Sequence, residues 1–165
     1  MSAQTMLIGN RPCRIYGEAH AEYLLLQMTG EHELQSMEGE VAAIAQSAHQ
    51  FLFAAIPVEN WNDELSPWEA PAVWGKQGFG GNAGDTLSFL TEQVISTLEQ
   101  QFPLPANVKI ILGGYSLAGL FALWAITSAP CITSLQSVVQ TAPSNGTAAG
   151  ISKMLTCARQ RRFAG

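Results

Sequence analysis

Short apolar runs alternate with longer amphipathic stretches along most of this chain. Residues 23–28, 51–58 and 108–112 are almost uninterrupted apolar runs, a pattern typical of strands that are buried on both faces. Residues 137–141 are a fourth candidate strand, and residues 11–16 are a candidate edge strand. Strands of this kind, separated by helical patterns, predict βαβ units and a mostly parallel sheet with flanking helices.

Three segments between or after these runs carry a helical pattern. Residues 33–49 and 86–101 place apolar side chains at spacings of three and four, and residues 117–128 are almost wholly apolar. Residues 59–82 form a long segment that is rich in Trp, Pro and Gly and has no periodicity. Loops of this length in compact domains are often functional. The pattern predicts a single α/β domain.

Composition limits the classes of function. The chain has 165 residues, of which 47% are hydrophobic and 13% charged, enough for one domain with a sizeable core. Glycines, prolines and polar residues interrupt the uncharged stretch 110–152, so we expect no membrane span. The first residues show no signal-peptide pattern, which favours a cytoplasmic protein. A net charge of −5 disfavours nucleic acid as a partner.

The cysteines do not indicate a metal or disulfide framework. Cys13, Cys131 and Cys157 are odd in number and widely spaced, so we interpret each as a buried, unreactive thiol. Nothing else in the sequence calls for a cofactor. We therefore expect neither a metal nor a cofactor.

The run GGYSLAG, which contains Ser116, directly follows the apolar run 108–112 and opens the helical segment 117–128. A nucleophilic serine is held above a sheet by a sharp, strained strand-to-helix turn, with small residues two before and two after it. Gly114 and Ala118 fill those two places. Ser116 is therefore the candidate nucleophile. The alternative is a tight glycine-rich turn with a capping serine.

The run GGYSLAGLFALW resembles the nucleophile elbow of the α/β-hydrolase superfamily, in the esterase branch that includes enterochelin-esterase-like enzymes. The segments IPVENWNDELSPWEAP, GKQGFGG and TLSFL are similar to small bacterial members of that branch. The resemblance covers residues 23–143. It implies a partial α/β-hydrolase fold, with strands three to six of the family's core, and a small carboxylic ester as substrate.

The resemblance also implies an oxyanion hole. One donor is the backbone N–H of Leu117, just after the nucleophile, and its helix N-terminus favours negative charge. The second donor comes from the loop after the family's third strand, which here is Thr29, Gly30 or Glu31. We favour Gly30, since a residue without a side chain lets the backbone come close.

The remaining catalytic residues of the family are missing from their usual places. Members place an acidic residue and then a histidine after the nucleophile, yet no Asp, Glu or His follows Ser116 in this sequence. A serine without a base is a weak nucleophile at neutral pH. His32 follows the strand 23–28, at the carboxyl edge of the expected parallel sheet where Ser116 also lies, and it is our candidate base. The alternative is a surface histidine. We expect His20 and His49 to lie far from Ser116.

Several side chains of the loop 59–82 are candidates for a site. Glu59 and Asp63 follow a strand at the expected edge, and we interpret them as solvated loop acids. The aromatic residues of the loop either line a substrate pocket or cover one another on the surface; they are Trp61, Trp68, Trp74 and Phe79.

The end of the chain differs from the rest. All 13 acidic residues lie at or before Glu99, and residues 144–165 are basic and lack a strand pattern. We interpret residues 1–143 as the N-terminal part of an α/β-hydrolase domain and 144–165 as an atypical tail. Either the gene product is truncated or frameshifted, or the domain is naturally shortened. A sheet that stops at 137–141 has an open edge, so we expect self-association.

The sequence thus predicts an esterase-like serine hydrolase that acts on a small-molecule ester through Ser116, with little activity. A non-catalytic member of the same fold is the main alternative. A base that a partner chain supplies to Ser116 is a third.

Overall fold

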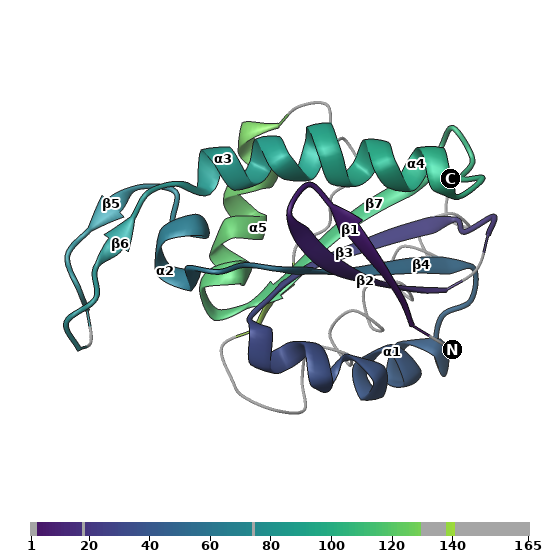
Figure 1. Ribbon diagram of the computed structural model, residues 1–165, viewed down its shortest axis with the longest axis horizontal. Helices are drawn as coiled ribbons and strands as arrows, with labels where there is room; N and C mark the ends of the chain where they lie inside the picture. The colour runs from purple at the N-terminus through teal and green to yellow at the C-terminus, as the bar shows by residue number, and fades with distance from the viewer. Residues whose placement is uncertain (1–2, 18, 74, 130–137, 141–165) are drawn as a thin grey trace, which may run out of the picture.

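A six-stranded sheet forms the centre of the molecule (Figure 1). The computed structural model describes residues 3–17, 19–73, 75–129 and 138–140. Within these ranges the strand order is β1-β2-β4-β3-β7-β8. The strands are β1 (Gln4–Ile8), β2 (Arg11–Gly17), β3 (Tyr23–Thr29), β4 (Phe51–Pro57), β7 (Lys109–Tyr115) and β8 (Val138–Gln140).

The later strands of the sheet run parallel. β3 pairs in parallel with both β4 and β7, and β7 pairs in parallel with β8, whereas β1 and β2 pair antiparallel. β3 lies between β4 and β7, so the carboxyl ends of these three strands meet at one edge of the sheet. The expected α/β architecture with a mostly parallel sheet is confirmed.

Helices cover both faces of the sheet (Figure 1). The short 3₁₀ helix η1 and helix α1 cover one face, and the remaining long helices cover the other. Residues 83–101 form an unbroken helical run whose middle part has π geometry. The helices are η1 (Glu31–Gln35), α1 (Met37–Ala45), α3 (Ala83–Ser88), the π segment η2 (Phe89–Ile95), α4 (Ser96–Gln101) and α5 (Ser116–Ser128).

The apolar runs are explained by burial on both faces. Every residue of β3 is buried. Leu24, Leu26 and Met28 contribute to the core beneath α3–α5, whereas Tyr23 and Leu25 contribute to the core beneath α1. A strand with two covered faces needs no polar alternation. The predicted strands 23–28, 51–58 and 108–112 correspond to β3, β4 and β7, and 137–141 contains β8.

Two sequence expectations need correction. Residues 11–16 form a strand, β2, but it is not at the edge, because β1 pairs with its outer side. The turn Gly9–Asn10, with Gly9 at φ 56°, lets the chain fold back within two residues. The predicted helix 33–49 is shorter and divided, because the 3₁₀ helix η1 ends at Gln35 and α1 runs only from Met37 to Ala45.

The segment after β4 has a small structure of its own. It contains helix α2 (Trp61–Glu64) and a two-stranded ribbon, β5 (Glu69–Ala70) and β6 (Phe79–Gly80), which projects from the body of the molecule (Figure 1). Asp63 accepts a hydrogen bond from the Asn82 side chain at 2.9 Å. A Cβ on Gly80 would lie 1.4 Å from the Asp63 carboxylate, so a larger residue there would displace that side chain.

Some sequence expectations fall outside the described residues. They concern the tail 144–165, Cys131, Cys157 and Trp74. Cys13 lies in the core with no exposed surface. None of the helices in the described part of the chain is both long and apolar enough to cross a membrane.

Candidate functional site

The turn between β7 and α5 holds Ser116 in an unusual backbone conformation. β7 ends at Tyr115 and α5 begins at Ser116, whose φ is 52° and whose side chain is exposed. A residue other than glycine in the left-handed region is uncommon and strained, and such strain clusters at functional sites. The hydroxyl group of Ser116 therefore lies at the carboxyl edge of the parallel strands, open to solvent.

Small residues make this turn sterically feasible. A Cβ on Gly114 would lie 2.6 Å from both the carbonyl carbon and the Cβ of Ala118. Ala118 is itself fully buried. The strand and the first turn of the helix are thus in direct contact, as the small residues on either side of Ser116 predict.

The backbone N–H of Leu117 lies at the start of α5. The first amides of a helix have no acceptor within that helix, and Leu117 is the second residue of the 13-residue helix α5. The aligned peptide dipoles place partial positive charge at this end. This amide can therefore stabilise a negative oxygen beside Ser116.

The loop after β3 lies next to this turn. The register between the two strands pairs Gln27 with Gly113, and its continuation brings Thr29 level with Tyr115. The N–H of Gly30, our expected second oxyanion donor, bonds to Oε2 of Glu33 at 2.9 Å. An oxyanion can take this N–H only if the Glu33 carboxylate releases it.

Glu33 is a residue of this edge that sequence reasoning missed. Its Oε1 accepts a hydrogen bond from the Tyr115 hydroxyl. The side chain is partly buried, and this burial raises its pKa, while the bond from Gly30 N–H acts in the opposite direction. A Glu at the third position after the N-cap Gly30 is the acidic half of a capping box, and the sequence shows it. Nothing in the sequence pattern indicates the contact with Tyr115.

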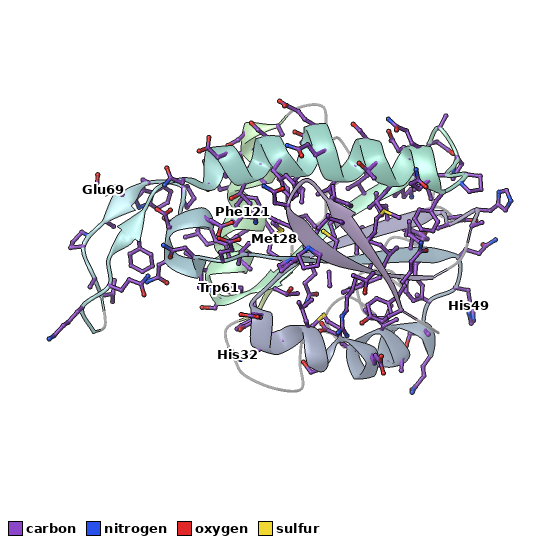
Figure 2. The ribbon with its side chains drawn as sticks, in the orientation of Figure 1. Met28, His32, His49, Trp61, Glu69 and Phe121 are labelled. Atoms are coloured by element: carbon purple, nitrogen blue, oxygen red, sulfur yellow. The ribbon has the colours of Figure 1, made fainter. Side chains whose placement is uncertain are left out.

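His32 and His49 lie at opposite ends of the helical segment that follows β3, as the sequence predicts. Figure 2 shows His32 at the same end of the molecule as Trp61, and His49 at the opposite end. His32 is exposed on η1. Among the described residues, no hydrogen bond joins His32 to Ser116. His20 lies in the turn before β3, with φ 66°.

The structure brings only part of the aromatic loop to Ser116. The ring of Trp61 packs against that of Tyr115, with centroids 5.5 Å apart. Trp68 is 58% exposed and precedes β5, and Phe79 belongs to β6 of the projecting ribbon. The Asp63 carboxylate accepts a hydrogen bond from the side chain of Asn82, just after β6, so it holds the base of the ribbon and not the turn at Ser116.

In the part of the chain that the structure describes, no three His, Cys, Asp or Glu side chains lie close enough together to hold a metal ion. Glu33 and Glu40 are close enough for each to affect the other's charge.

Comparisons with known proteins identify the fold. The IroE-like serine hydrolase from Shewanella oneidensis matches 77% of this chain and 46% of its own, with a TM-score of 0.66 and 18% identity. The siderophore hydrolase EstB from Aspergillus nidulans matches 79% of this chain, with a TM-score of 0.55 and 18% identity. The chain has the α/β-hydrolase fold.

A second siderophore hydrolase, EstA from Aspergillus nidulans, matches 78% of this chain at 20% identity and a TM-score of 0.53. A scan against protein-family models and a search of curated proteins both find no match. The chain spans about half the length of these structures: 46% of the first, 53% of EstA and 52% of EstB. The α/β-hydrolase fold implied by the sequence resemblance is thus confirmed.

Proposed function

We propose that this chain is an esterase-like serine hydrolase that acts on a small carboxylic ester through Ser116. The observation that carries this proposal is the exposed Ser116, held at φ 52° between a parallel strand and the helix that follows. The likeness of the fold to a serine hydrolase and to siderophore hydrolases supports it. A sharp turn from strand to helix is the position in which a nucleophile elbow presents its serine.

The chemistry is acyl transfer. The Ser116 oxygen attacks the ester carbonyl, and its proton passes to a base as the tetrahedral intermediate forms. Leu117 N–H and an amide of Thr29, Gly30 or Glu31 stabilise the oxyanion. The base then protonates the departing alcohol, which leaves an acyl group on Ser116. Water, activated by the same base, releases the acid and restores the hydroxyl group.

His32 is the base in this proposal. It lies on the 3₁₀ helix η1, which follows the carboxyl end of β3, and Ser116 follows the carboxyl end of the neighbouring strand β7. A neutral imidazole is the side chain best suited to proton transfer near neutral pH. Since no hydrogen bond joins His32 and Ser116 in the described structure, proton transfer requires that they approach each other or share a water molecule.

A fluorophosphonate probe tests the proposal. We expect the probe to label Ser116 in the folded protein, and Ser116→Ala to abolish labelling and hydrolysis of p-nitrophenyl acetate. Ser128→Ala, at the other end of α5, is the matched control and leaves both unchanged. His32→Ala lowers hydrolysis about 10²-fold or more. Folded protein that the probe does not label contradicts the proposal.

A non-catalytic role is the second candidate. It is favoured by the lack of any Asp, Glu or His after Ser116 in this sequence, because residual catalysis without a base is small. This candidate predicts that the wild type and Ser116→Ala hydrolyse p-nitrophenyl acetate at the same rate. Hydrolysis that Ser116→Ala removes would exclude it.

A further inference from the structure

Glu33 links the loop after β3 to the residue that precedes Ser116. Its Oε2 accepts the N–H of Gly30 at 2.9 Å, and its Oε1 accepts the hydroxyl of Tyr115. The two donors come from the ends of neighbouring parallel strands, and Glu33 and Tyr115 are 82 positions apart in the sequence. One carboxyl group thus spans the two segments that would hold an ester carbonyl between them.

Tyr115 is held on two sides. The ring of Trp61 packs against its ring, with centroids 5.5 Å apart, while Glu33 accepts its hydroxyl hydrogen. Tyr115 itself has extended backbone angles, and the chain turns sharply at the next residue, where φ is 52°. Such a strained residue persists only where its surroundings over-determine it. Contacts that fix Tyr115 therefore also fix the direction in which the chain enters the turn.

We propose that Glu33 is a positioning residue: by holding the N–H of Gly30, it sets the separation between the other candidate donors of this loop, the amides of Thr29 and Glu31, and the hydroxyl of Ser116. This inference rests on the proposed function, because the separation matters when a substrate carbonyl lies between these groups. Hydrogen bonds to a carboxylate are stronger than those between neutral groups. A displacement of about 1 Å at a reacting centre costs about 10²-fold in rate, so loosening this link slows acyl transfer.

Hydrogen exchange of the Gly30 amide tests the link without reference to activity. Tyr115→Phe removes one hydroxyl group that touches Glu33 but not Gly30. We expect this variant to exchange the Gly30 N–H about tenfold faster than the wild type, because a released Glu33 holds it less firmly. Tyr16→Phe is the matched control, since the Tyr16 hydroxyl is buried without a partner in the described structure.

The rate of fluorophosphonate labelling tests the effect on Ser116. We expect Tyr115→Phe and Glu33→Gln each to lower the rate at saturating probe about tenfold, with the probe's affinity unchanged. The double variant is no slower than the slower single variant, because both act through one link. Glu38→Gln, which removes an exposed charge on α1, leaves the rate unchanged.

The two measurements separate failure of this inference from failure of the proposed function. Unchanged Gly30 exchange in Tyr115→Phe, or unchanged labelling in folded Glu33→Gln, overturns the positioning role even when the wild type is labelled. When the probe labels no wild-type Ser116, the proposed function fails. Gly30 exchange then decides the link alone: faster exchange in Tyr115→Phe supports it, and unchanged exchange overturns it.

Discussion

Glu40 and Gln27 form a polar pair between α1 and β3 that is only half satisfied. Gln27 Nε2 donates to Glu40 Oε2 at 3.3 Å, while Gln27 Oε1 and Glu40 Oε1 are buried without partners in the described structure. Burial raises the pKa of Glu40, the bond from Gln27 lowers it, and the nearby Glu33 raises it. A protonated Glu40 can donate to Gln27 Oε1, which the ionised form cannot do.

The pH dependence of stability follows from the raised pKa of Glu40. Because the folded pKa lies above the unfolded value, this group's contribution to stability is fully present below the unfolded pKa. It is lost as the pH rises through the folded pKa. At neutral pH, which lies above the unfolded pKa, Glu40 therefore contributes less to the stability of the folded state than it does at low pH.

We expect Glu40→Gln to raise the stability at pH 7.5 by about 1 kcal/mol, since its amide both accepts from and donates to Gln27. The corresponding rise in Tm is about 2–4 °C. At pH 4 the gain shrinks, because wild-type Glu40 is then largely protonated. Glu38→Gln, exposed on the same helix, is the control. An equal gain at both pH values would contradict the assignment.

At the same scale, the sequence predicted the sharp turn at Ser116 and the need for a small residue at Gly114, because both depend on spacing along one short segment. The catalytic roles of Ser116 and Leu117 stay predictions. The sequence did not predict that Glu33 bonds to Tyr115. That contact depends on the register between β3 and β7, and no local pattern encodes the alignment of strands so far apart in the chain.

Among the elements, strands buried on both faces were predicted well, because burial leaves a continuous apolar signal. β1 was missed, since its residues are mostly exposed and its apolar pattern is weak. The turn Gly9–Asn10 is the signal that would have found it. The ribbon β5–β6 is too short to carry a period. The break between η1 and α1 falls at Ser36, inside a stretch whose apolar periodicity continues, so periodicity does not report it.

The contact between β7 and α5 predicts the effect of Gly114→Ala. The new methyl group would lie 2.6 Å from the backbone and Cβ of Ala118, so the helix has to shift. We expect a loss of about 1–3 kcal/mol in the free energy of unfolding, measured by chemical denaturation, together with loss of probe labelling at Ser116.

Gly84→Ala is the control for that substitution. Gly84 lies in α3, where a Cβ would meet nothing within 4 Å, so alanine stabilises the helix by about 0.5–1 kcal/mol. A Gly114→Ala variant as stable as the wild type would show that strand and helix are not in tight contact.

For the molecule as a whole, the core can be probed through Cys13. This thiol has no exposed surface, and burial raises its pKa to about 11, while Arg11 acts to lower it. In a background with Cys131→Ser and Cys157→Ser, we expect iodoacetamide to react at the rate of global unfolding. Reaction at once in denaturant is the control. Fast reaction in a stable native protein would show that β2 opens locally.

The outer strand β1 bears on association. It lies at the edge of the sheet, and Leu7 on it is 71% exposed. Exposed edges pair with other chains unless charges protect them. We expect light scattering to detect self-association that Leu7→Lys reduces. Val73→Lys, at an equally exposed position on the ribbon, is the matched control. A wild type that stays monomeric at high concentration contradicts this expectation.

The position of β3 between β4 and β7 affects how the protein folds while it is being synthesised. β4 follows β3 closely in the chain, whereas β7 leaves the ribosome much later. Until then one flank of β3 has no neighbour, and unpaired strand edges of this kind make incomplete chains prone to aggregation. The distant pairing that completes the sheet is slow to form. The strand-to-helix turn that holds Ser116 therefore takes its place at the sheet edge only after β7 has paired with β3.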